Sequence, residues 1–126
     1  MIPISDLKRQ YESIKPEIDD AIQRVFSDSR FILGKQVEEF ETEFAAYNGS
    51  KYAVAVGSGT EALHLSLVAC GIGKGDEVIT VPNTAVFTVS AITCAGAKPV
   101  FVDIEKRNYL MDIDKLEKAM PQTKSC

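Results

Sequence analysis

Residues 54–63 read Val54-Ala55-Val56-Gly57-Ser58-Gly59-Thr60-Glu61-Ala62-Leu63, and this stretch decides the fold. The apolar run predicts a short buried strand, the Gly-Ser-Gly-Thr turn ends it, and a helix is expected to follow at once. A strand that turns directly into a helix aims backbone N–H groups and the positive end of the helix dipole at one point. The stretch therefore predicts a binding site for a phosphate group.

The turn at 57–60 has a second interpretation, an ordinary tight connection between a strand and a helix that binds nothing. Local sequence alone leaves both open, because anion sites at helix starts are common. Two better-known phosphate motifs are absent. No Gly-Lys-Ser/Thr follows, as in a Walker loop, and position 62 holds alanine where the dinucleotide fingerprint needs its third glycine. A redox enzyme that binds NAD is therefore disfavoured.

Beyond Lys51 the pattern predicts strands that alternate with helices of 6 to 12 residues, which is typical of an α/β domain with a mainly parallel sheet. The expected strands are 52–56, 77–81 and 100–104. The expected helices are 60–70, 84–95 and one that begins at Asp112 or Asp114 and ends at Ala119, before Pro121.

The first 50 residues are expected to form a helical segment. One helix is predicted from apolar residues at helical spacing, with Pro16 near its start, where the missing N–H costs nothing. A second is predicted after the break at 31–34 and is closed by Asn48-Gly49 in a left-handed stop. The apolar positions are Ile14, Ile18, Ile22 and Val25 in the first helix and Val37, Phe40, Phe44 and Tyr47 in the second.

Composition excludes several classes of protein. The chain has 126 residues, 45% of them hydrophobic and 25% charged, which fits one modest globular domain. A formal net charge of −4 argues against nucleic-acid binding, because no basic stripe can neutralise backbone phosphates. The start of the chain turns polar too soon for a signal peptide, and no apolar run is long enough to span a bilayer. We expect a cytoplasmic protein.

Other candidate residues have plain structural interpretations. Three cysteines without CxxC spacing and a single histidine, His64, make no convincing zinc site, so no metal is expected. His64 is read as a packed or exposed helix residue rather than a catalyst. Asp103 ends an apolar strand, where α/β sheets place ligand groups, although a turn residue is the commoner role there. The acidic face at Glu38, Glu39, Glu41 and Glu43 is read as a solvated surface.

Taken together, the motifs resemble the opening of the DegT/StrS family of sugar aminotransferases. The likeness spans nearly the whole chain in the right order. It is carried by Phe31-Ile32-Leu33-Gly34, Val37, Phe40-Glu41, Phe44-Ala45, Tyr47-Asn48-Gly49, residues 56–63, Gly73-Lys74-Gly75-Asp76-Glu77-Val78-Ile79, Val81-Pro82-Asn83-Thr84, Ala91-Ile92, residues 96–104 and Thr123-Lys124.

This resemblance implies the large domain of a fold-type-I enzyme dependent on pyridoxal phosphate (PLP). Such enzymes take an amino group from an amino acid, usually L-glutamate, and deliver it to a nucleotide-linked keto-sugar. Members generally work as homodimers. Carried over by position, Ser58, Gly59 and Thr60 would hold the PLP phosphate. The resemblance does not name the sugar, and it does not separate aminotransferases from the few dehydratase-like members.

The chain also departs from the complete family pattern. The lysine that binds PLP and the aspartate that pairs with its ring nitrogen lie downstream of this region in the family, so no catalytic residue is assigned. Relatives often carry a ring-stacking aromatic residue after the Thr of the Pro-x-x-Thr segment. Here that neighbour is Ala85 and the only nearby aromatic is Phe87, so the stacking role is unassigned.

We therefore expect residues 1–126 to be an incomplete N-terminal part of the PLP-transferase domain, inactive alone. In the family's fold the first strand is separated from the next two by strands that come later. Strand 52–56 would lack its neighbour, while 77–81 and 100–104 could pair. The alternative is a non-catalytic fragment that binds a phosphorylated ligand or docks on a full-length relative.

Overall fold

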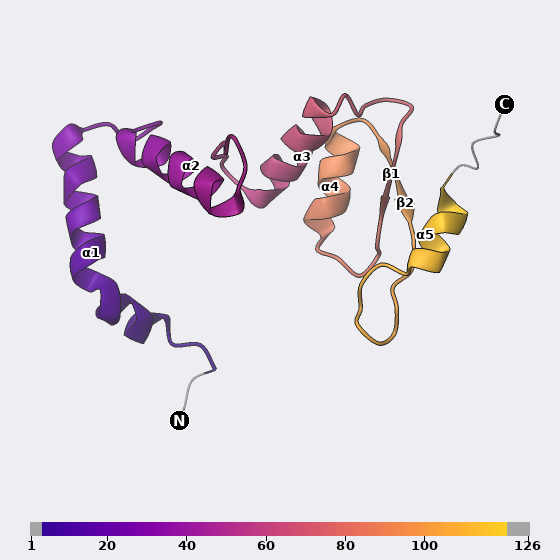
Figure 1. Cartoon of the computed structure of the whole chain (residues 1–126), viewed down its shortest axis with the longest axis horizontal. Helices are drawn as coiled ribbons and strands as arrows, with labels where there is room; N and C mark the ends of the chain where they lie inside the picture. The colour runs from indigo at the N-terminus through magenta and orange to yellow at the C-terminus, as the bar shows by residue number, and fades with distance from the viewer. Residues whose placement is uncertain (1–3, 121–126) are drawn as a thin grey trace. The chain divides into compact units, whose positions relative to one another are not determined.

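The computed structural model describes residues 4–120, which divide into two units between Ala55 and Val56. Figure 1 shows the order of the elements along the chain. They are α1 (Leu7–Asp28), α2 (Lys35–Asn48), α3 (Gly59–Ala69), β1 (Glu77–Thr80), α4 (Val86–Cys94), β2 (Lys98–Phe101) and α5 (Ile113–Ala119). Among the described residues only the second unit contains strands.

Helix α1 begins earlier than the sequence predicts. The Asp6 carboxylate accepts a hydrogen bond from Arg9 N at 3.0 Å and so caps the first turn. Pro16 consequently lies inside the helix, and its predicted place near the helix start is wrong. A proline in the interior removes one hydrogen bond and crowds the preceding turn. The helix nevertheless continues on both sides of Pro16.

Helix α2 ends where the sequence predicts. Gly49 adopts φ 66°, and its N–H donates to the carbonyls of Ala45 and Ala46 in a left-handed cap. On this helix Glu38, Glu39 and Glu43 are exposed, as expected of a solvated face. Glu41 differs, because it is half-buried and accepts a hydrogen bond from Ala55 N at 2.7 Å.

The predicted strand at 52–56 is wrong, because these residues pair with no other strand within 4–120. A strand needs a neighbour to satisfy its N–H and C=O groups. The contact from Ala55 N to Glu41 supplies one substitute acceptor. The expectation that this segment would lack its neighbour is confirmed.

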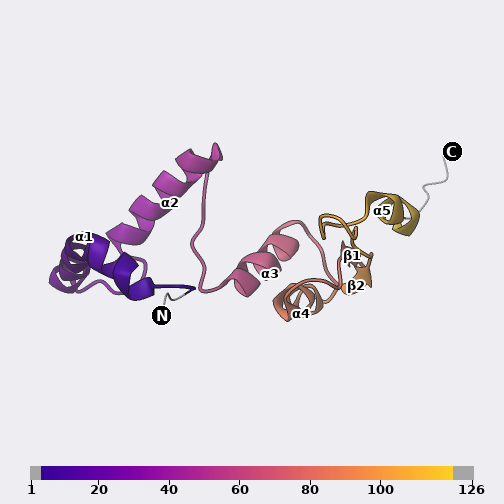
Figure 2. The ribbon, with the colours of Figure 1, turned by 90° about the horizontal axis from the view of Figure 1, so that it is seen from below.

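Strands β1 and β2 form a parallel two-stranded sheet, as predicted for these two runs. Glu77 pairs with Lys98, and Thr80 pairs with Phe101. The second strand ends earlier than the predicted range 100–104, and Ile104 instead forms an isolated antiparallel bridge to Met111. Helix α4 covers one face of the sheet and packs against α3 (Figure 2).

The small core of the described chain lies mainly in this second unit. Ala91 and Ile92 on α4 are 0% and 2% exposed, and Val102 after β2 is 4% exposed. Helix α5 follows, and the Asp112 carboxylate caps it by accepting from Lys115 N at 3.2 Å. Asp112, rather than Asp114, is therefore the residue that begins the last helix. Pro121 lies outside the described residues.

Gly96 joins α4 to β2 in the left-handed region, at φ 83°. An added Cβ there would also lie 3.4 Å from Lys74 N. We expect G96A to destabilise this connection by about 1–2 kcal/mol, because left-handed backbone disfavours a Cβ. Amide exchange at Ala97 and Lys98 should become about 5- to 30-fold faster. G59A is the matched control, since Gly59 has no positive φ and nothing within 4 Å of an added Cβ.

Candidate functional site

The candidate site lies at the start of α3. Figure 1 shows that α3 and α4 both run against the direction of the strands, so α4 begins at the end of the sheet where β1 finishes. In α/β proteins ligands bind at this carboxyl end of the strands. The turn at 57–60, which the sequence singles out, leads directly into α3.

Ser58 is the N-cap of α3. Its backbone is extended, at φ −162° and ψ 161°, and its carbonyl accepts the first helical hydrogen bond from Ala62 N at 3.0 Å. Its hydroxyl oxygen accepts from Glu61 N at 3.2 Å. A serine here satisfies one of the amide groups that every helix start leaves without a partner.

The next two amides remain open. Within residues 4–120, Gly59 N and Thr60 N donate to no protein acceptor. Gly59 is exposed, and a Cβ built on it meets no atom within 4 Å. Unpartnered amides at a helix N-terminus, beside a serine and a threonine hydroxyl, are the donor set that a phosphate group requires. These residues therefore fit the phosphate of PLP in donor type and access.

The structure adds a role for Glu61, which is not among the predicted site residues. Its carboxylate accepts a hydrogen bond from Gly57 N at 2.8 Å. Together with the Ser58 hydroxyl contact, this makes a reciprocal arrangement close to a capping box. The spacing Ser58-x-x-Glu61 is the sequence signal that could have found it.

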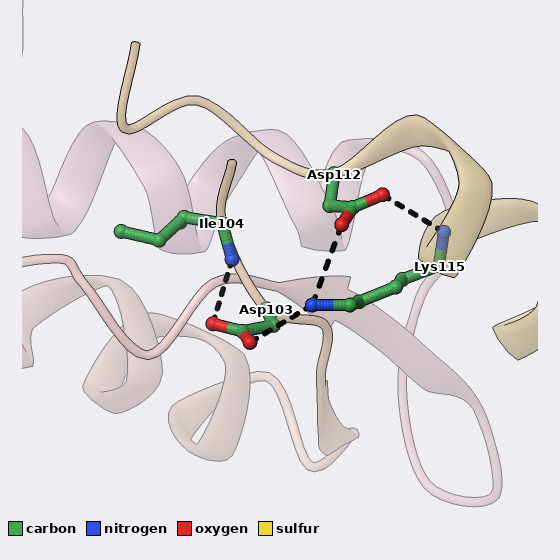
Figure 3. Close-up of polar contacts among 4 residues, drawn as sticks. All are labelled: Asp103, Ile104, Asp112 and Lys115. Atoms are coloured by element: carbon green, nitrogen blue, oxygen red, sulfur yellow. Dashed lines mark hydrogen bonds and ion pairs between the residues drawn. The ribbon is translucent and has the colours of Figure 1, made fainter. Parts of the chain in front are cut away.

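Asp103 follows β2 in a segment without regular secondary structure, and its carboxylate is engaged by other residues of the chain. Figure 3 shows its carboxylate between Ile104 N, at 2.9 Å, and Lys115 Nζ, also at 2.9 Å. Lys115 Nζ lies 3.3 Å from Asp112 as well, so the cluster ties the start of α5 to the end of β2. The Lys115 hydrogen bond, and secondly that of the Ile104 amide, lower the pKa of Asp103.

Replacing Lys115 tests whether this cluster lowers the pKa of Asp103. We expect K115M to raise the pKa of Asp103 back toward its ordinary value, because the hydrogen bond that lowers this pKa most is lost. A carboxyl group whose pKa is lower in the folded than in the unfolded chain stabilises the fold at any pH above its unfolded pKa. That stabilisation is lost as the pH falls through the folded pKa. The affected window therefore lies below about pH 4. Carbon-13 NMR of the Asp103 carboxyl measures the shift. K118M, which removes a cation from the same helix, should leave it unchanged.

The other sequence candidates take no part in the site. His64 is half-buried on α3, and its imidazole makes no hydrogen bond within residues 4–120. Ala85 is the N-cap of α4, and Phe87 in its first turn is 59% exposed. Nothing in the structure assigns Phe87 the stacking role. The described residues contain no cluster of His, Cys, Asp or Glu that could hold a metal ion.

Comparison with known proteins supplies the context for this geometry. The family model of the DegT/DnrJ/EryC1/StrS aminotransferases matches residues 12–125. The chain belongs to the DegT/DnrJ/EryC1/StrS aminotransferase family. The resemblance read from the sequence is thereby confirmed.

Individual members of the family match closely. A dTDP-3-amino-3,4,6-trideoxy-alpha-D-glucose transaminase of Micromonospora megalomicea subsp. nigra is 50% identical over 117 residues, which cover 92% of this chain and 31% of that protein. The crystal structure of DesV from S. venezuelae matches with a TM-score of 0.91 at 42% identity, over 96% of this chain and 33% of that one.

A third match comes from a different reaction type. The structure of GDP-4-keto-6-deoxy-D-mannose-3-dehydratase from E. coli, solved with bound hydrated PLP, gives a TM-score of 0.76 at 35% identity, over 82% of this chain and 28% of that one. The fold is therefore that of the PLP-dependent transferases, as expected from the sequence. This chain spans about a third of the length of the relatives it matches. No helix within residues 4–120 has the length and hydropathy to cross a membrane.

Proposed function

We propose that residues 1–126 form the N-terminal part of the major domain of a PLP-dependent sugar aminotransferase. In this proposal residues 1–50 are the helical N-terminal segment and 51–126 the α/β portion. The enzyme transfers an amino group from an amino acid, L-glutamate, to a nucleotide-linked keto-sugar. It works as a homodimer in the cytoplasm. The family membership and the transaminase named among the relatives support this assignment.

Ser58, Gly59 and Thr60 are the residues we propose for the PLP phosphate. The observation that carries this is the pair of unpartnered amides at Gly59 and Thr60, at the start of a helix in a PLP-dependent family. When bound, PLP supplies an electron sink for the transfer of the amino group. The chain's contribution is to hold the phosphate through amides and hydroxyls, and so to fix the position of the cofactor ring. No catalytic residue is assigned within residues 1–126.

The experiment uses the longest polypeptide that the gene encodes. It is purified with PLP, and its visible absorption band is followed before and after borohydride. We expect a bound band that borohydride fixes covalently onto a lysine beyond residue 126. Incubation with glutamate and a dTDP- or UDP-linked keto-sugar should then yield an amino sugar. A polypeptide that binds PLP and eliminates a hydroxyl from the sugar, without amination, would instead be a dehydratase. No PLP binding would refute the proposal.

A further inference from the structure

We propose that Glu61 is a positioning residue that preorganises the phosphate-binding turn, a role that rests on the proposed function above. Its carboxylate lies 2.8 Å from Gly57 N, and its own N–H lies 3.2 Å from the Ser58 hydroxyl oxygen. One residue thus contacts the turn on both sides of the Gly57–Ser58 bond. It acts on residues proposed to touch PLP without being one of them.

The contact to Ser58 holds that hydroxyl oxygen at the start of α3. A serine oxygen that accepts from Glu61 N has its single proton left to donate. The O–H is therefore available to an anion bound to the Gly59 and Thr60 amides. The contact to Gly57 has a complementary effect. It satisfies an amide just before the helix and so holds the bend of the turn in place.

The Glu61 carboxylate occupies the space that a side chain at position 57 would need. A Cβ at position 57 would lie 2.9 Å from Glu61 Oε2, closer than real Cβ contacts allow. Because the carboxylate is the far end of a flexible side chain, G57A should displace it and leave the backbone in place. G57A is therefore expected to imitate E61A, and the two changes should not add.

The charge of Glu61 has an effect separate from its hydrogen bonds. A negative group in the first turn favours the helix but disfavours a second negative group bound nearby. E61Q keeps an oxygen that accepts from Gly57 N and removes the charge. We expect E61Q to bind PLP at least as tightly as the natural chain and E61A to bind about tenfold more weakly.

The test compares PLP dissociation constants of the longest encoded polypeptide carrying no change, E61Q, E61A, G57A or G57A/E61A. E117Q is the control, because Glu117 is an exposed carboxylate on α5. A second readout is the phosphorus-31 shift of bound PLP against pH. E61Q should lower the pKa of the bound phosphate, since a neighbouring negative charge is gone. E117Q should not move that pKa.

The outcomes separate the two proposals. If the unchanged protein binds no PLP, the proposed function and the role of Glu61 both fail. If it binds PLP and E61A binds equally well, only the role of Glu61 is overturned. A double variant whose loss equals the sum of both single losses would overturn the coupling of Gly57 to Glu61. Rescue by E61Q, a non-additive double variant and the shifted phosphate pKa together support the inference.

Discussion

Produced alone, the 126-residue chain is expected to unfold without a sharp calorimetric transition and to bind apolar dyes in its folded form. A compact domain of this length would absorb about 90 kcal/mol at its midpoint, at roughly 0.7 kcal/mol per residue. We expect a broad transition with well under half of that enthalpy. Differential scanning calorimetry and analytical ultracentrifugation would measure the enthalpy and the state of association.

The reason is that little apolar surface is buried. Five apolar side chains of the described residues are buried, four of them alanine or valine, and none of the larger ones is fully enclosed. By contrast, aromatic and aliphatic side chains on every helix are exposed, among them Phe40, Phe44, Leu63 and Phe87. Burial of such side chains is the main favourable term in folding.

The sheet adds a second source of instability. It has two strands, and an isolated pair of strands is at best marginally stable. Within residues 4–120 the outer edges of β1 and β2 pair with no further strand, and their open backbone groups invite association with other chains. A monodisperse sample with a cooperative transition near 90 kcal/mol would contradict this expectation. The longest polypeptide that the gene encodes is the control, and it should unfold cooperatively.

Most of the correct predictions concern features that depend on a few residues close together in the sequence. The left-handed stop at Gly49 and the aspartate cap before α5 depend on a few neighbouring residues, so their chemistry is visible in sequence. The pairing of β1 with β2 also followed, because each strand is a clear apolar run joined by one helix. The start of α1 was predicted wrongly, because Pro16 suggested a start close to it whereas the Asp6 cap begins the helix at Leu7.

Features that depend on non-local partners could not be read from the sequence. Residues 52–56 have the composition of a strand, but a strand requires a neighbour, and none lies within 4–120. Glu41 looked like part of a solvated face because its acceptor role depends on Ala55, which is 14 residues away. The turn at 57–60 was found from its glycines and serine. The contact from Glu61 to Gly57 was not predicted, although it is local and the spacing Ser58-x-x-Glu61 is its sequence signal.

Replacing Ser58 should have the largest effect at the candidate site, because this residue has two separable roles. S58A removes the N-cap, which stabilises the start of α3 by about 1 kcal/mol. It also removes the hydroxyl proposed to donate to the PLP phosphate. A hydrogen bond to a charged group contributes about 1.5–3 kcal/mol, so PLP affinity should fall about 10- to 100-fold.

S58G distinguishes the two roles, since glycine at an N-cap costs only a few tenths of a kcal/mol but still lacks the hydroxyl. We expect S58A to accelerate amide exchange across α3 and S58G to leave it nearly unchanged, while both weaken PLP binding. S58T restores a hydroxyl that can cap and donate, so it should recover most of the affinity. If S58G bound PLP as tightly as the unchanged protein, the hydroxyl of Ser58 would have no part in holding the cofactor. The phosphate would then be held by the Gly59 and Thr60 amides or by donors elsewhere in the polypeptide.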